Sequence, residues 1–217
     1  MPEATSSAHL TTPDARVTGI VPAAGSSTRM GAPKALLRLG GATFARLVVT
    51  ALRDGGCAPV LFVVREGDDE AAGEAEAAGA TVLPNPDPGP GPITSLRLAL
   101  AGLDERVEHV VWLPLDHPRV RPETVARLIA EARGHGAPIT LPVQGGRRGH
   151  PAVFSRSIFP ELTDPGLEGG ARTVVHRHLD EARLVETGDA GVLIDVDTPA
   201  EYEALLGSEA RLSRNPR

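Results

Sequence analysis

The chain has 217 residues, of which 41% are hydrophobic and only 3% aromatic, and its net charge is −6 at pH 7. That length suffices for one α/β domain with a core built mainly from Ala, Val, Leu and Ile. The negative charge argues against a general nucleic-acid binder, which carries a basic face, but leaves room for a small anionic ligand. No apolar run is long enough to span a bilayer, so no membrane partner is expected.

The two ends of the chain are polar, and the first residues lack the apolar segment of a secretory signal. We predict a disordered tail over residues 1–16, a single domain over 17–206, and a flexible tail over 207–217. The one cysteine, Cys57, excludes an internal disulfide and a CxxC metal site. It is expected to be a small residue near a strand, in a protein of the reducing cytoplasm.

Short apolar runs bounded by turn residues predict strands, and apolar residues recurring every three or four positions predict helices. In the first half of the chain, the predicted elements are a strand at 17–22, a helix at 44–54, a strand at 60–64, a helix at 67–78, a strand at 80–83 and a helix at 93–103. The second half begins with a strand at 109–115, a helix at 121–133, a strand at 139–143 and an extended run at 151–154. It continues with a helix at 171–178, an extended run at 183–186, a last strand at 192–197 and a final helix that ends at Leu206. Residues 84–92 are rich in proline and glycine and predict a stiff loop, which is neither helix nor interior strand.

Two of the predicted helices begin with recognisable capping residues. Thr43 precedes the first helix in the position of an N-cap. Thr198 precedes the last helix, with Pro199 at the first helical position and Glu201 three residues after Thr198, which is the spacing of a capping box.

The alternation of strands and helices predicts a parallel or mostly parallel sheet that is covered by helices on both faces. In such open sheets, ligands bind at the carboxyl ends of the strands. Three polar features follow predicted strands: the loop around Gly25, Asp116 and Asp197. We therefore expect these features to meet at one edge of the sheet.

The loop after the first strand is built for close approach to an anion. Ala23, Ala24 and Gly25 have almost no side chain, so consecutive backbone N–H groups can face a ligand. Arg29 and Lys34 add two positive charges to the same segment. The loop matches neither the dinucleotide-binding pattern G-x-G-x-x-G nor the P-loop. By composition alone, a tight turn with two solvated cations fits equally well.

The segment from Ala23 to Lys34 reads Ala-Ala-Gly-x-Ser-x-Arg-Met-Gly-x-x-Lys and resembles the signature of the MobA-like NTP transferases, most closely the molybdenum cofactor cytidylyltransferases. Three further stretches resemble family motifs in the same order, and the resemblance covers roughly residues 17–206. These stretches are Gly91-Pro92-Ile93-Thr94-Ser95-Leu96, Leu115-Asp116-His117-Pro118 and Ile194-Asp195-Val196-Asp197-Thr198-Pro199. Four motifs in order are far more specific than any one of them.

The resemblance implies a three-layer α/β/α sandwich with a Rossmann-like, mostly parallel sheet of the nucleotide-diphospho-sugar transferase type. It implies an enzyme that moves a nucleoside monophosphate from an NTP to a phosphorylated acceptor, with Mg²⁺ as cofactor and release of pyrophosphate. The catalytic residues that it implies are Arg29, Lys34 and Asp116, and the metal ligands are Asp116 and Asp197. The nucleotide-binding residues that it implies are Ala23, Ala24, Gly25, Ser26, Arg29, Lys34, Asn85 and Ser95.

These implied roles agree with the chemistry of the residues. Mg²⁺ prefers one or two carboxylates together with phosphate oxygens and water. Phosphoryl-type transfer needs positioning and charge neutralisation rather than a protein nucleophile. Asp195 is the weaker metal candidate, because only the motif register separates it from Asp197. His176 and His178 lie two positions apart on a predicted helix and make a poor metal pair.

The acceptor side of the predicted site rests on a basic turn. His-Pro segments such as His150-Pro151 occur in the family near the acceptor, and we hypothesise that Arg147, Arg148 and His150 contact its phosphate or ring system. A solvated basic hairpin is an equally good interpretation. His117 departs from the Gln or Met that cytidylyl members carry at this position, which leaves the acceptor open.

The form of the first motif and the Ser95-Leu96 pair resemble cytidylyl rather than guanylyl members, so CTP is predicted over GTP. Molybdopterin is then the implied acceptor, and delivery of the product to a molybdoenzyme would follow. A sugar phosphate or an alcohol phosphate is an alternative acceptor. An NAD(P)H-dependent oxidoreductase is a second alternative, and a non-catalytic nucleotide-binding regulator is a third. The lack of a G-x-G-x-x-G motif and the presence of both metal-site carboxylates argue against the oxidoreductase. Lys34, Asp116 and Asp197 together argue against the regulator.

Overall fold

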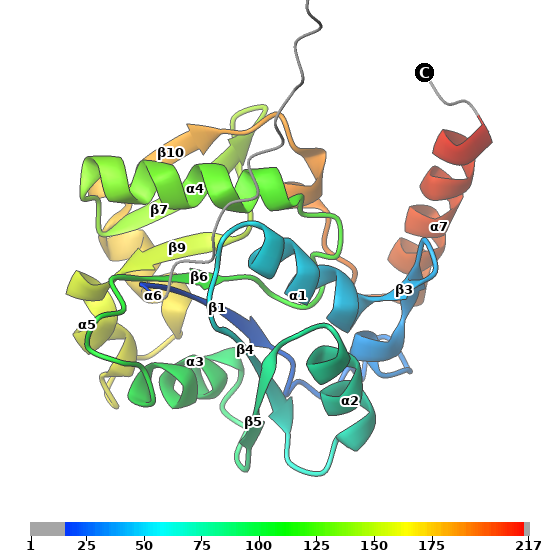
Figure 1. Ribbon diagram of the computed structural model, residues 1–217, viewed down its shortest axis with the longest axis horizontal. Coiled ribbons are helices and arrows are strands. Elements are labelled where there is room, and N and C mark those ends of the chain that lie inside the picture. The colour runs from blue at the N-terminus through cyan, green and yellow to red at the C-terminus, as the bar shows by residue number, and fades with distance from the viewer. Residues whose placement is uncertain (1–15, 215–217) are drawn as a thin grey trace, which may run out of the picture.

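The computed structural model describes residues 16–214, and the predicted tail over 1–16 lies almost wholly outside them. Its centre is an eight-stranded sheet in the order β10-β7-β9-β6-β1-β4-β5, with β8 paired to β7 (Figure 1). The strands of this sheet are β1 (Val17–Pro22), β4 (Val60–Arg65), β5 (Thr81–Asn85), β6 (His109–Trp112), β7 (Ile139–Gln144), β8 (Arg147–Arg148), β9 (Ala152–Ser155) and β10 (Arg183–Glu186). Strands β5, β4, β1, β6, β7 and β10 run parallel, whereas β9 and β8 run antiparallel to their neighbours.

Helices cover both faces of the sheet, as Figure 1 shows, and each face has its own apolar core. One face carries α1 (Phe44–Asp54), α2 (Asp69–Ala77) and α4 (Pro122–His135), and the other carries α3 (Pro92–Ala101), α5 (Phe159–Thr163) and α6 (Ala171–Arg177). The side chains alternate along β1, so Val17 and Val21 enter the first core and Ile20 enters the second. The predicted three-layer, mostly parallel architecture is confirmed.

The predicted helix caps form as expected. The Thr43 hydroxyl accepts a hydrogen bond from the Arg46 backbone amide at the start of α1. At the last helix, α7 (Pro199–Arg214), the Glu201 carboxylate accepts from the Thr198 amide at 2.8 Å, and the Glu201 amide donates to the Thr198 hydroxyl at 3.4 Å. This reciprocal pair is a capping box.

Several predicted boundaries are wrong. Residues 192–197 do not form a strand, because Ala190–Leu193 is a 3-10 helix, η4, and the chain after it is irregular. The last helix continues past Leu206 to Arg214, so most of the predicted flexible tail is helical. Pro84 and Asn85 belong to the edge strand β5, and Pro92 is the first residue of α3. A short hairpin of β2 (Arg38–Leu39) and β3 (Ala42–Thr43) was not predicted.

Helix α7 stands out from the body beside this hairpin (Figure 1). Its Tyr202 hydroxyl donates to the Arg38 carbonyl at 2.8 Å and accepts from the Arg38 amide, and its ring packs edge-on against Phe44. Among residues 16–214, no helix is long and apolar enough to cross a membrane.

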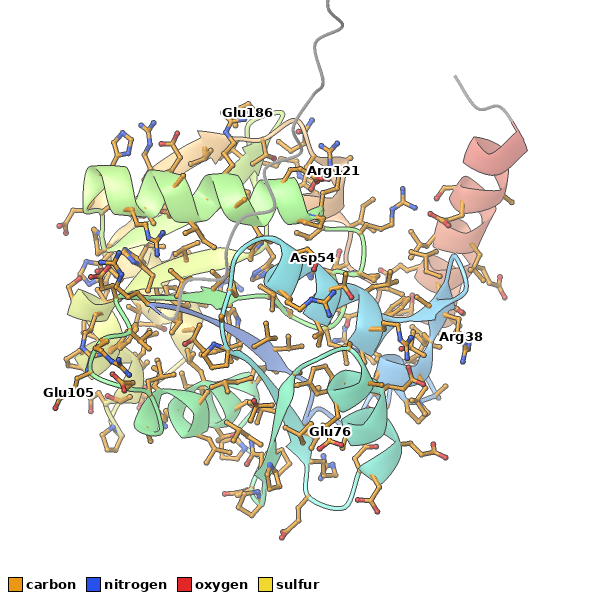
Figure 2. All side chains as sticks on the ribbon, in the orientation of Figure 1. Arg38, Asp54, Glu76, Glu105, Arg121 and Glu186 are labelled. Atoms are coloured by element: carbon orange, nitrogen blue, oxygen red, sulfur yellow. The ribbon has the colours of Figure 1, made fainter. Side chains whose placement is uncertain are left out.

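Asp189 joins the segment before η4 to the start of α4. Its side chain is buried and accepts hydrogen bonds from the Arg121 amide at 3.0 Å, the Thr124 hydroxyl at 2.7 Å and the Gly191 amide at 2.9 Å. No side chain of α4 itself caps its first turn, so Asp189 caps that helix from a distant part of the sequence. Figure 2 shows Arg121 near the start of α4, on the same side of the molecule as Glu186.

We expect Asp189→Ala to lower the free energy of unfolding by about 2–4 kcal/mol, because it leaves three donors, two of them buried, without an acceptor. Asp189→Asn keeps one acceptor oxygen and should lose less. Urea unfolding followed by circular dichroism measures both, with the exposed Asp180→Ala as the control. An Asp189→Ala protein as stable as that control would contradict the capping role.

Candidate active site

A cleft of about 1310 Å³ opens at the carboxyl ends of β1 and β6. Almost all of the predicted site residues line it. Those that do are Ala23, Ala24, Gly25, Ser26, Arg29, Lys34, Ser95, Asp116, Arg148, His150 and Asp197. The sheet edge predicted from the sequence is therefore where the predicted site residues meet.

The loop that follows β1 lines the cleft. The Ala23 amide still belongs to the sheet, since it donates to the Val63 carbonyl at 2.7 Å. Within residues 16–214, the amides of residues 24–29 donate no hydrogen bond to the protein. The turn is held by Ser27, which has a positive φ of 50° and accepts from the Met30 amide at 3.0 Å. Such a run of unused N–H groups is an anion-binding concavity.

Four charged side chains meet beside this loop. The Lys34 ammonium forms ion pairs with Asp197 and, at 3.7 Å, with Asp116. The Arg29 guanidinium lies 2.7 Å from the other carboxylate oxygen of Asp197. The Lys34 side chain is only 13% exposed, whereas that of Arg29 is 71% exposed, so Lys34 is the buried centre of the cluster.

The backbone brings the two carboxylates together although only one of them follows a strand. Asp116 lies just beyond the end of β6. Asp197 lies in the irregular segment after η4, where the neighbouring Val196 amide donates to the Asp116 carbonyl at 3.0 Å. This long-range hydrogen bond places Asp197 beside Asp116, where the strand predicted over residues 192–197 had been expected to put it.

His117 is buried behind Asp116 and orients its carboxylate. The His117 Nδ1 lies 2.7 Å from the Asp116 Oδ1, and the ring packs edge-on against His150 with centroids 4.6 Å apart. Burial raises the pKa of Asp116, but the hydrogen bond and charge of His117, together with the charge of Lys34, outweigh it and hold this pKa below its ordinary value. Asp116 is therefore an anion throughout the neutral range.

His150 reaches the cleft because the chain beside it packs tightly. The His150 amide donates to the Val192 carbonyl at 2.9 Å, and a Cβ on Gly149 would lie 2.1 Å from that same oxygen. Only glycine permits this approach. The Nδ1 atom of His150 is buried and has no hydrogen-bond partner within the described residues.

Burial lowers the pKa of His150 to about 4, with a further lowering from the charge of His117 and an opposing effect of Asp116. An unfolded histidine titrates near 6.5, so the unfolded chain binds the extra proton first as the pH falls. Stability contributed by the neutral ring is thus present above about pH 6.5 and is lost as the pH falls toward about 4.

We expect the wild type to lose up to about 3 kcal/mol more than His150→Gln between pH 7 and pH 4, because the variant lacks this titration. Urea unfolding at a series of pH values measures the difference, and His176→Gln, which removes an exposed histidine, is the control. Parallel profiles for wild type and His150→Gln would contradict a neutral His150.

Asn85 is the predicted site residue that does not line the cleft. It is buried, and its amide nitrogen donates to the Thr94 hydroxyl at 2.9 Å and to the Ser95 hydroxyl at 3.2 Å. Its role in the structure is to hold the start of α3, from which Ser95 reaches the cleft. Arg147, unlike Arg148, is also outside the cleft lining.

Three residues near the cleft escaped the sequence analysis as site residues. Arg65, at the end of β4, donates to the Ala24 carbonyl at 3.3 Å and so contacts the loop from behind. Arg172 and His176 line the cleft from α6. Their spacing of four residues places them on one helix face. The sequence analysis compared His176 only with His178 and did not consider this pair.

The donor set suits Mg²⁺ bound together with phosphate oxygens. Among the described residues, no group of three or more His, Cys, Asp or Glu side chains could hold a metal by itself. Two carboxylates, Asp116 and Asp197, share one ammonium partner and face the same cleft. Mg²⁺ is commonly bound by one or two carboxylates plus substrate phosphates, so these residues fit it.

Comparisons with known proteins agree with the fold. The 2-C-methyl-D-erythritol 4-phosphate cytidylyltransferase of Saccharopolyspora erythraea is 37% identical over 133 residues, which cover 58% of this chain and 59% of that relative. The solved homologue of Mycobacterium tuberculosis rv0371c from Mycobacterium sp. strain JC1 has a TM-score of 0.78 at 32% identity, over 91% of this chain and 98% of that one. Rv0371c of M. tuberculosis H37Rv, described as a complex with manganese, has a TM-score of 0.72 at 32% identity, over 89% and 99% of the two chains.

The model of the MobA-like NTP transferase domain matches residues 19–182. That range begins within β1 and includes the Gly25 loop, Asp116 and His150. The fold is the three-layer type of the nucleotide-diphospho-sugar transferases, as predicted. The chain belongs to the MobA-like NTP transferase family.

Proposed function

We propose that the protein is a Mg²⁺-dependent nucleotidyltransferase that moves a nucleoside monophosphate, with CTP as donor, to the phosphate of a small acceptor. One observation carries the proposal. Lys34 holds both Asp116 and Asp197 beside a loop whose amides at residues 24–29 are unused within the described chain. The cleft thus offers two carboxylates for a metal ion, and it offers backbone amides together with positively charged side chains for a triphosphate.

In the proposed reaction, an oxygen of the acceptor phosphate forms a bond to the α-phosphorus of the NTP. The bond between that phosphorus and the oxygen bridging to the β-phosphate breaks, and pyrophosphate leaves with the electron pair. Asp116 and Asp197 would hold Mg²⁺, which neutralises phosphate charge. Arg29 and Lys34 would bind the triphosphate and stabilise the charge that develops on pyrophosphate.

Ala23, Ala24, Gly25, Ser26 and Ser95 would surround the rest of the nucleotide, with Asn85 acting through Ser95. Arg148 and His150 would contact the acceptor. Because the imidazole of His150 is neutral at physiological pH, it can donate one hydrogen bond and accept another, but it brings no charge to the acceptor phosphate.

Molybdopterin is the acceptor that we propose first, with delivery of the product to a molybdoenzyme in the cytoplasm. An alcohol phosphate is the second candidate, and a specific observation favours it. The S. erythraea relative, 37% identical over 133 residues, is named for a cytidylyl transfer to 2-C-methyl-D-erythritol 4-phosphate.

Pyrophosphate release with each of the four NTPs, with and without Mg²⁺, and with molybdopterin or 2-C-methyl-D-erythritol 4-phosphate, tests the proposal. We expect turnover with CTP and Mg²⁺ and with one of the two acceptors. Turnover led by GTP would overturn the choice of base. Oxidation of NADPH without any NTP turnover would favour an oxidoreductase instead.

A further inference from the structure

The wall of the cleft formed by α6 carries two basic side chains that the proposed reaction does not use. Arg172 and His176 are four residues apart, so they lie one above the other on a single helix face. Both side chains are exposed, and both line the cleft that also holds Lys34 and Asp116. A group bound by this pair would therefore share the cleft with the reacting phosphates.

The basic side chains of α6 and of His178, which directly follows it, divide into paired and unpaired sets. Arg177 and His178 face Glu161 of α5, at 3.7 Å and 2.6 Å respectively. Within residues 16–214, the side chains of Arg172 and His176 form no hydrogen bond and no ion pair. The protein thus neutralises the positive charge on the side of α6 that meets α5 and leaves it uncompensated on the side that meets the cleft.

The other cations of the cleft show the same contrast. Lys34 and Arg29 pair with Asp197, and Arg97 donates to the backbone carbonyls of Leu162 and Asp164. The side chain of Arg148 on β8, like that of Arg172, has no hydrogen-bond or ion-pair partner within the described residues. Unpaired guanidinium groups in a cleft attract anions, and their planar fork matches a carboxylate or phosphate.

We propose that Arg172 and His176 bind a second anionic group of the acceptor, a carboxylate or a phosphate that is separate from the phosphate receiving the nucleotidyl group. This inference rests on the proposed nucleotidyl transfer and restricts its acceptor to one with two anionic groups, which disfavours 2-C-methyl-D-erythritol 4-phosphate, whose single phosphate is its only anionic group. Arg148 and His150 then hold the reacting phosphate, and Arg172 selects for the second group from α6. Arg172 is a specificity-determining residue that takes no part in bond making.

Two pairs of probes test the proposal by calorimetric titration in the presence of Mg²⁺ and CTP. Glycerol 3-phosphate and 3-phosphoglycerate differ by a carboxylate, and fructose 6-phosphate and fructose 1,6-bisphosphate differ by a phosphate. We expect the wild type to bind the member with two anionic groups about tenfold more tightly in one pair. Arg172→Ala should abolish that preference and leave the affinity for CTP unchanged.

Arg177→Ala is the matched control, because it removes the same charge from the same helix on the side that is paired with Glu161. It should keep the preference at equal ionic strength. No preference in the wild type, an unchanged preference in Arg172→Ala, or an equal loss in Arg177→Ala would each overturn the proposal. A protein that fails to bind CTP but keeps an Arg172-dependent preference would instead overturn the proposed function and leave the anion site standing.

Discussion

Asp116→Asn is expected to lower turnover by about a thousandfold or more, with the fold intact. The substitution keeps the size of the side chain and its place beside His117 but removes the negative charge that a metal ion needs. Lys34 would keep Asp197 as its partner, so no buried charge is left alone. Pyrophosphate release under saturating CTP and Mg²⁺ measures the loss.

Asp195→Asn is the matched control for this experiment. Asp195 lies two residues before Asp197, lines the same cleft and is exposed, with no ion pair within the described residues. Its loss should change turnover only slightly. Thermal unfolding establishes that both variants are folded. If Asp116→Asn and Asp195→Asn kept equal activity, the assignment of Asp116 as a metal ligand would be wrong.

The local parts of the fold could be predicted from the sequence because they depend on neighbouring residues. The apolar run of β1, the cap at Thr43 and the capping box at Thr198 each need only a few adjacent positions. The position of Asp116 followed in the same way, from a buried strand and the rule that ligands bind at its carboxyl end.

Long-range backbone contacts could not be predicted from the sequence, and they explain why the strand predicted over residues 192–197 does not form. Residues 192–197 have the composition of a buried strand. However, Gly191 packs against the Arg119 carbonyl so closely that a Cβ would lie 2.1 Å from that oxygen. Asp189, in the preceding turn, accepts a hydrogen bond from the Arg121 amide at the start of α4. The segment therefore turns instead of extending. Asp197 still reaches Asp116, because the Val196 amide bonds to the Asp116 carbonyl.

Side-chain contacts that depend on the fold could not be predicted from the sequence either. His117 was an unexplained departure from the family motif, and only the fold shows it between Asp116 and His150. Asn85 was grouped with the nucleotide-binding residues, yet its hydrogen bonds to Thr94 and Ser95 turn it away from the cleft. Motif spacing identifies residue types that belong near a site but not which of them face the ligand.

Lys34→Met is expected to have two opposite effects, a loss of turnover of about a thousandfold and a tighter binding of Mg²⁺ in the absence of nucleotide. The ammonium now occupies the space between Asp116 and Asp197 and neutralises both carboxylates. Without it, the two negative charges repel each other and attract a divalent cation more strongly. The same change removes a positive charge from the triphosphate end of the cleft.

Thermal shift with Mg²⁺ alone measures the gain in Mg²⁺ binding, and pyrophosphate release measures the loss of turnover. Arg29→Met is the graded comparison, since Arg29 also pairs with Asp197 but its side chain is 71% exposed, so its charge is better screened. It should alter Mg²⁺ binding less than Lys34→Met does. If Lys34→Met lost activity without any gain in Mg²⁺ binding, Lys34 would act on the nucleotide alone, and the two carboxylates would not share a metal site.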